Sequence, residues 1–122
     1  MQSLILFAHG ARDPAWAAPF ERLRALAGAA MPTASVELAF LELMQPDLPT
    51  VVAQQVAAGS RRVTVIPVFL GQGGHVRRDL PQLLEQLRQA HPEVEIRTVP
   101  AVGEDEAVLQ AIAAYCIGAV QD

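Results

Sequence analysis

Leu4-Ile5-Leu6-Phe7-Ala8, followed directly by His9, is the stretch that decides the fold. Five consecutive apolar residues are typical of a strand that is buried on both faces of a parallel sheet. A second strand-like run, residues 63–70, is followed by four residues rich in glycine and then by His75. If both runs are parallel strands of one sheet, both imidazoles emerge at its carboxyl edge, where open α/β sheets bind ligands.

Strand and helix signals alternate along the whole chain, so the sequence predicts the order βαβαβαβα. Caps support the helices, because Asp13 precedes Pro14 and Asp47 stands before an apolar stretch of helical spacing. We expect a single α/β domain over residues 1–122, with three αβα layers, a four-stranded, mostly parallel sheet, and helices that bury both of its faces. Strands are expected over residues 4–8, 35–41, 62–69 and 95–99, and helices over residues 13–31, 47–59, 76–90 and 104–119.

Composition excludes several classes of protein. Apolar residues make up 52% of the 122 residues, which is typical of a globular chain and not of a disordered one. The net charge of −4 argues against general nucleic-acid binding, and no apolar run approaches the ~20 residues of a membrane helix. The first residues lack a basic signal region, so a cytoplasmic protein is expected. The lone cysteine, Cys116, is expected to be a small buried hydrophobe.

Three polar residues, His9, Glu42 and His75, are separated by equal steps of 33 residues. In a regular βαβαβ unit such a step returns the chain to the same edge of the sheet, so these side chains are expected close together. Imidazole and carboxylate groups suit a divalent ion such as Co²⁺, Ni²⁺, Fe²⁺ or Zn²⁺, and they could equally serve as a general base and proton relay. His91 stands at a helix end, at the opposite edge, and is excluded from this site.

Arginines gather near the two histidines, since Arg12, Arg77 and Arg78 each lie within three residues of one of them. They are either solvated side chains or a cationic rim for an anionic ligand. The intervening turn, Gly71-Gln72-Gly73-Gly74, matches neither the phosphate-loop pattern nor the dinucleotide fingerprint. Its glycines would let a bulky, flat ligand approach the backbone.

Three segments together resemble a known family. His9-Gly10-Ala11-Arg12-Asp13-Pro14 resembles the HGSRDP opening of the short CbiX-type sirohydrochlorin chelatases, which belong to the class II chelatases. Residues 39–49 and 65–81 are similar to the second and third motifs of these proteins, in the same order and spacing. The chain departs from the pattern at Ala11, where Ser is common, and at Gln45, where Glu is often found.

The resemblance implies a lyase-type enzyme that inserts a divalent metal, Co²⁺ or alternatively Ni²⁺ or Fe²⁺, into sirohydrochlorin during cobalamin or sirohaem biosynthesis. No organic cofactor is implied, because the metal is itself a substrate. His9 and His75 would bind the metal or accept protons, and Glu42 would assist them. The resemblance and the size of the ligand imply a homodimer, and no nucleic acid or membrane partner. The macrocycle would be bound by the arginines named above, by Gln45, and by Leu70, Gly71, Gln72, Gly73 and Gly74.

Two other functions stay open from the residues alone. A tetrapyrrole or metal carrier without turnover would need the same groups as a chelatase. A small phosphate-handling α/β enzyme could use His9 with Arg12 and Arg78, although no acidic metal cluster or nucleophile motif accompanies them.

Overall fold

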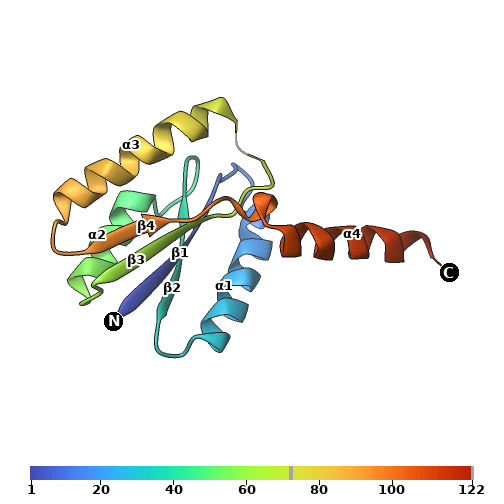
Figure 1. The fold of residues 1–122 in the computed structure, drawn as a ribbon, viewed down its shortest axis with the longest axis horizontal. Coiled ribbons are helices and arrows are strands. Elements are labelled where there is room, and N and C mark those ends of the chain that lie inside the picture. Colours follow the sequence, from blue (N-terminus) through green and yellow to red (C-terminus); the bar gives the residue numbers. More distant parts are fainter. Residues whose placement is uncertain (72, 122) are drawn as a thin grey trace.

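Strands and helices alternate along the chain in the computed structural model, which describes residues 1–71 and 73–121, with the side chain of His75 left out of the description (Figure 1). The elements of this described part are β1 (Gln2–Ala8), η1 (Pro14–Ala17), α1 (Ala18–Ala30), β2 (Ser35–Phe40), α2 (Leu48–Ala57), β3 (Arg62–Pro67), α3 (Gly74–Ala90), β4 (Glu95–Thr98), η2 (Val102–Glu104) and α4 (Glu106–Val120). The two elements named η are short 3-10 turns. The predicted order of strands and helices is confirmed.

The four strands form one sheet in the order β2-β1-β3-β4, and every pairing between them is parallel. The α/β class is therefore confirmed. Ala8 at the end of β1 pairs with Phe40 at the end of β2, and Phe7 pairs with Pro67 at the end of β3. The carboxyl ends of the three strands thus finish level with one another, which brings the segments after them to one edge.

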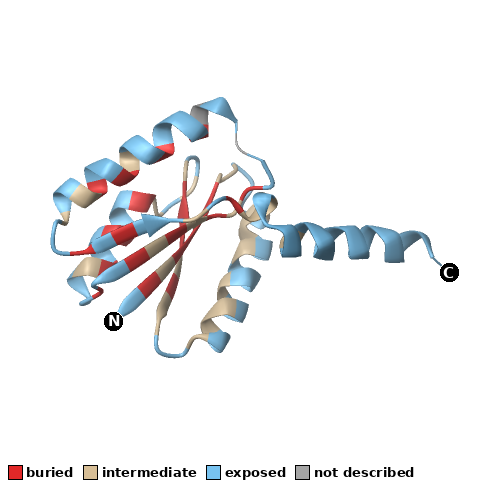
Figure 2. Cartoon of the chain, in the orientation of Figure 1, coloured by how far each residue is buried: buried red, intermediate tan, exposed pale blue. Residues whose placement is uncertain are grey.

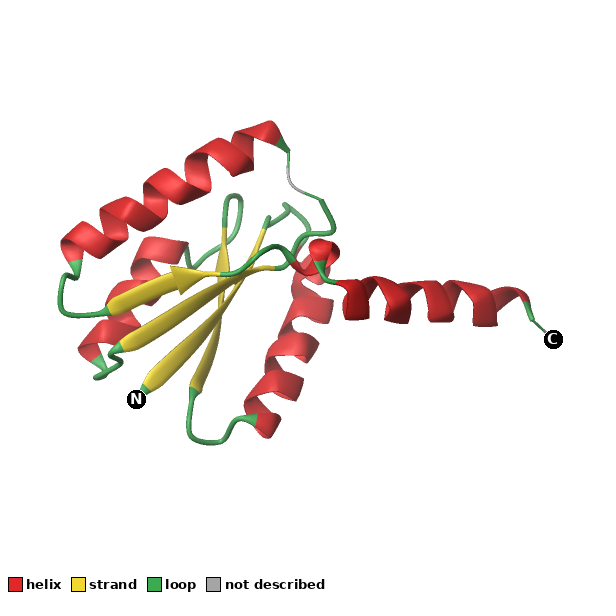
Figure 3. Ribbon diagram, in the orientation of Figure 1, coloured by secondary structure: helices red, strands yellow, loops and turns green. Residues whose placement is uncertain are grey.

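Topology decides which helix covers which face. The chain moves from β1 to β2 in one direction across the sheet and then from β2 to β3 to β4 in the other. Because such crossovers are right-handed, α1 must lie on one face and α2 and α3 on the opposite face. Figure 3 shows helices on both faces of the sheet.

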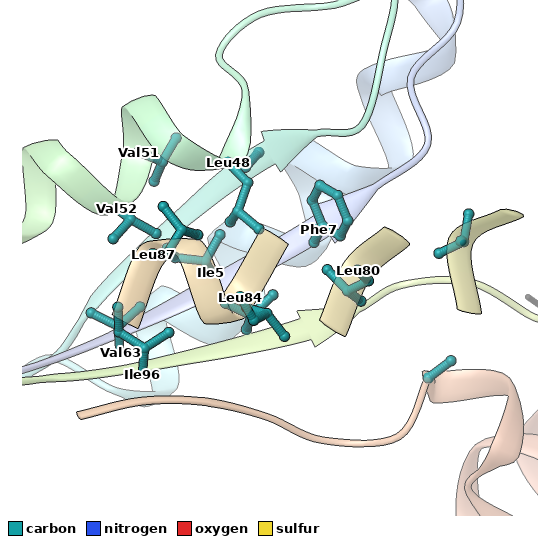
Figure 4. Packing of buried hydrophobic residues seen from close by; sticks show 14 of the residues in the cluster. Ile5, Phe7, Leu48, Val51, Val52, Val63, Leu80, Leu84, Leu87 and Ile96 are labelled. Carbon is teal, nitrogen blue, oxygen red and sulfur yellow. The ribbon is translucent and has the colours of Figure 1, made fainter. Parts of the chain in front are cut away.

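The main hydrophobic core lies between the sheet and the helices α2 and α3. Ile5 and Phe7 from β1 and Val63 from β3 point to this side, where Leu84 and Leu87 of α3 meet them (Figure 4). A smaller core lies under α1, where the side chains of β1 and β2 meet residues of η1 and α1. Its buried members are Leu6, Ala8, Val36, Leu38 and Phe40.

The prediction that helices bury both faces of the sheet is only half right. On the face that α1 covers, Thr64 and Ile66 of β3 are only partly buried and Arg97 of β4 is exposed. The last helix, α4, projects away from the sheet, and none of its residues is buried (Figure 2). The expectation that Cys116 is buried is therefore wrong, because it lies on this projecting helix and is exposed.

The two predicted N-terminal caps of helical segments are confirmed. The carboxylate of Asp13 accepts a hydrogen bond from the Ala15 N–H at 2.9 Å, and that of Asp47 accepts one from the Thr50 N–H at 2.9 Å. The first turn after Asp13 is a 3-10 turn, and the α-helix begins only at residue 18. The helix α3 begins at residue 74, two residues earlier than predicted, so the backbone of His75 belongs to its first turn.

Candidate functional site

The imidazole of His9 lies at the carboxyl edge of the sheet, directly after β1. Its ring packs on the ring of Phe69, with centroids 4.2 Å apart and an angle of 36° between the planes. Phe69 is only 3% exposed and also contacts Phe7, at 6.0 Å between centroids. Within the described residues the ring nitrogens of His9 form no hydrogen bond. Ring packing therefore orients this imidazole and leaves its nitrogens available to a ligand.

Backbone hydrogen bonds join the segments that follow β1 and β2. The N–H of Leu41 donates to the carbonyl of Ala8 at 2.8 Å, and the N–H of Glu42 donates to the carbonyl of His9 at 3.0 Å. Gly10 lies against this junction with a φ of +93°, and a Cβ there would be 1.8 Å from the Glu42 carbonyl oxygen. Only glycine fits such a conformation and such a contact. The structure thus brings the backbones of His9 and Glu42 together, with the Glu42 side chain exposed.

The backbone of His75 lies at the amino end of α3. This helix is fixed to the core by Val76, which is 4% exposed, and by Leu80, which is 8% exposed. The side chain of His75 and the whole of Gln72 lie outside the described residues. The predicted meeting of the two imidazoles therefore stays a prediction.

The predicted cationic rim is exposed. Arg12 lies in the loop after β1, and Arg77 and Arg78 lie in the first turns of α3. None of the three forms an ion pair with another described residue. The amino end of a helix already carries positive partial charge, so arginines there add to that potential and are not neutralised by it. Binding of an anionic ligand by these arginines stays a prediction.

Leu70, Gly71 and Gly73 lie between β3 and α3, and Gly74 is the first residue of α3. Leu70 is 67% exposed, and a Cβ at any of the three glycines would meet open space. Packing within the chain therefore does not require glycine at these positions, whereas close approach of a ligand to the backbone would. Gln45 is exposed in the loop after β2, next to a cis peptide bond to Pro46.

No group of three His, Cys, Asp or Glu side chains in residues 1–71 and 73–121, His75 apart, lies in a position to hold a metal ion. Elsewhere along the edge, hydrogen bonding by the Thr50 side chain, and then by its N–H, lowers the pKa of Asp47 at the start of α2.

Sequence reasoning did not identify Phe69 as the ring under His9. It also missed the role of Gly10. A signal for the latter was present, because a glycine directly after a strand and a polar residue is typical of a backbone that needs a positive φ. The carboxyl edge carries an oriented imidazole, the exposed side chain of Glu42 and three exposed arginines, and this is the edge at which open α/β sheets bind ligands.

Comparison with known proteins identifies the family. The family model CbiX matches residues 3–116, and the chain belongs to this family. Sirohydrochlorin cobaltochelatase of Methanocaldococcus jannaschii is 32% identical over 91 residues, which cover 75% of this chain and 64% of that protein. Sirohydrochlorin ferrochelatase of Bacillus subtilis is 30% identical over 76 residues, which cover 62% of this chain and 29% of that protein. The matched region thus spans less than two thirds of these relatives.

Solved structures show the same fold. The crystal structure of a putative cobalamin biosynthesis CbiX protein from Marinobacter aquaeolei has a TM-score of 0.86 and 32% identity, and the match covers 98% of both chains. The structure of SirB from Bacillus subtilis with Fe³⁺ has a TM-score of 0.82 and 23% identity, and covers 99% of this chain but 48% of that one. No helix in the described residues is long and apolar enough to cross a lipid bilayer.

Proposed function

We propose that this protein inserts a divalent metal ion into sirohydrochlorin, with Co²⁺ as the metal, and that it works as a homodimer. The observation that carries the proposal is the imidazole of His9, packed on Phe69 at the carboxyl edge with its nitrogens free of other described residues. Membership of the CbiX family supports the reaction, as do relatives named for cobalt and iron insertion.

The chemistry of metal insertion requires two events at one place. Two pyrrole N–H groups of the macrocycle must lose their protons, and the ion must take their place, so that each M²⁺ bound releases two protons. A neutral imidazole near pH 7 can accept one proton or hold the ion before transfer. His9 takes one of these roles, the predicted partner His75 takes the other, and the exposed carboxylate of Glu42 receives protons or attracts the ion.

The substrate has chemistry that matches the rest of the edge. Sirohydrochlorin is a flat macrocycle ringed by carboxylates. Arg12, Arg77 and Arg78 would form charge-assisted hydrogen bonds to that ring of carboxylates. The glycines between β3 and α3 leave room for the plane of the macrocycle, and the exposed side chain of Leu70 offers an apolar contact to it.

The test is the absorption change of sirohydrochlorin with Co²⁺, measured against a protein-free control and repeated with Ni²⁺ and Fe²⁺. His9→Ala should lower the catalysed rate by roughly 10²-fold or more, as expected when a positioned acid–base group is lost. His91→Ala is the matched control, because His91 caps α3 at the opposite edge of the sheet. It should keep the wild-type rate.

Two outcomes would contradict the proposal in different ways. A wild-type rate in His9→Ala would remove this residue from the site. A wild-type protein that binds sirohydrochlorin stoichiometrically, without exceeding the protein-free rate at excess substrate, would be a carrier and not an enzyme.

A further inference from the structure

Two leucines at the carboxyl edge of the sheet are largely exposed. Leu43, in the loop after β2, is 58% exposed, and Leu70, in the segment after β3, is 67% exposed. In the strand order β2-β1-β3 these two segments lie on either side of the one that follows β1 and begins with His9. Single exposed leucines are ordinary on protein surfaces. Exposure alone therefore assigns no role to either residue, and the backbone has to be considered.

The backbone at Leu43 adopts a conformation that leucine rarely takes. Its φ is +66°, and among the described residues it is the only one besides glycines with a positive φ. The N–H of Met44 donates to the carbonyl of Glu42 at 2.8 Å, which closes a three-residue γ-turn around Leu43. A γ-turn with a positive φ is rare and strained, and glycine or asparagine fits a positive φ better than leucine does. Leucine at this position therefore costs the fold both backbone strain and apolar exposure.

The γ-turn is anchored on both sides. On one side the half-buried Met44 packs against the small core under α1. On the other side the N–H of Glu42 donates to the carbonyl of His9 at 3.0 Å. The position of Leu43 relative to His9 is therefore set by the fold, while its side chain belongs to neither core of the described chain. Strain that is held in place without a gain in packing indicates a role outside the core.

Leu70 is fixed next to His9 in a similar way. It directly follows Phe69, whose ring packs on the His9 ring with centroids 4.2 Å apart. Its backbone is also covered by η2, since a Cβ at Gly103 would lie 1.8 Å from the Leu70 carbonyl oxygen. Leu43 and Leu70 thus each follow directly after a residue that contacts His9. This adjacency separates the two from an exposed leucine such as Leu26 on α1.

We propose that Leu43 is a substrate-positioning residue, which packs together with Leu70 on the face of the flat macrocycle that approaches His9. This inference rests on the proposed function, because it takes sirohydrochlorin as the substrate. The macrocycle carries its carboxylates at the rim and its apolar surface on its two faces, so arginines and leucines contact different parts of it. Contacts at the rim alone leave the plane free to tilt. An apolar side chain on each side of His9 holds the plane over the imidazole, and the γ-turn places one of them there.

Binding of metal-free sirohydrochlorin, followed by its absorption spectrum, tests the inference without metal insertion. Leu43→Ala should raise the Kd about tenfold, because the exposed part of the leucine side chain is no longer buried on binding. Leu43→Met keeps an apolar side chain of similar volume and should bind several-fold more tightly than Leu43→Ala. Leu26→Ala is the matched control, since Leu26 is 52% exposed in the second half of α1, which runs away from the carboxyl edge. It should keep the wild-type Kd.

Thermal unfolding separates this role from a role in the fold. Leu43→Gly removes the Cβ that makes a positive φ costly, so its Tm should fall no more than about 2 °C below that of the wild type, while its Kd rises as in Leu43→Ala. A larger fall in Tm would mean that the leucine stabilises its own chain, and it would overturn the inference.

The remaining outcomes distinguish this inference from the proposed function. Light scattering should give Leu43→Ala the same solution mass as the wild type, and a changed mass would assign Leu43 to a contact between copies and overturn the inference. An unchanged Kd in Leu43→Ala, with a wild type that binds sirohydrochlorin, would overturn this inference alone and leave the proposed function intact. A wild type that does not bind sirohydrochlorin would overturn both.

Discussion

Substitution of Gly10 by alanine tests the backbone junction that positions His9 and Glu42. The new Cβ would lie 1.8 Å from the carbonyl oxygen of Glu42, whereas real Cβ atoms do not approach closer than 3.0 Å. The segments after β1 and β2 must therefore separate by more than 1 Å. The hydrogen bond from the Glu42 N–H to the His9 carbonyl, 3.0 Å long, cannot survive such a shift.

The cost can be worked from two contributions. A positive φ costs a residue with a side chain about 1–2 kcal/mol, and a lost backbone hydrogen bond costs about 1 kcal/mol. Together Gly10→Ala should lower the free energy of unfolding by about 2–3 kcal/mol. For a chain of 122 residues the entropy of unfolding is about 0.26 kcal/mol per kelvin, so the Tm should fall by about 8–12 °C.

Thermal unfolding followed by circular dichroism or calorimetry measures this effect. Gly28→Ala is the matched control, because Gly28 lies inside α1 and a Cβ there would meet nothing within 4 Å. This control should raise stability by about 0.5–1 kcal/mol. If Gly10→Ala unfolds within about 2 °C of the wild type, the junction after β1 and β2 is not the rigid contact described above.

Two further substitutions test features away from the site. Ser3→Ala removes a hydroxyl that donates to Gln55 at 2.9 Å and contacts the fully buried Ser60. Chemical denaturation should therefore show a free energy of unfolding about 1–3 kcal/mol lower than that of the wild type. An unchanged free energy of unfolding would mean that these buried hydrogen bonds do not stabilise the fold. Asp47→Ala removes the cap of α2 and should cost about 1 kcal/mol at pH 7. Since the pKa of Asp47 is lowered in the folded chain, the cap stabilises above the unfolded pKa of about 3.9 and is lost as the pH falls through the folded pKa. The difference in free energy of unfolding between wild type and Asp47→Ala should therefore disappear below about pH 4. A difference that persists there would contradict the capping role.

The sequence predicted the sheet because its signals are local. Apolar runs and caps such as Asp47 act within a few residues, and these elements appear close to the expected positions. Pro67, which lacks an N–H, stands at the last position of β3, where a missing donor is tolerated. The position of α4 could not be predicted in this way. An apolar helix after the last strand has the same pattern whether it covers its own sheet or another, so Cys116 was expected inside and lies outside.

In the candidate site, too, local features could be predicted and contacts between distant segments could not. His9 could be placed at the carboxyl edge from the run before it, but the ring beneath it could not, because Phe69 reaches it from the segment that follows another strand, β3. Nor could the junction at Gly10 be predicted in detail, since it depends on where the segment after β2 passes. Pairwise contacts across the sheet are set by register, and register is a property of the whole fold.

The way in which His9 is held bears on how it could work. Metal-binding histidines in permanent sites ordinarily donate their second N–H to a carboxylate or a carbonyl, which fixes the ring and strengthens the metal ligand. Among the described residues His9 has no such partner and rests on the face of Phe69. Ring packing limits the tilt of the imidazole. An imidazole oriented in this way suits the proposed reaction, in which the ion is a substrate.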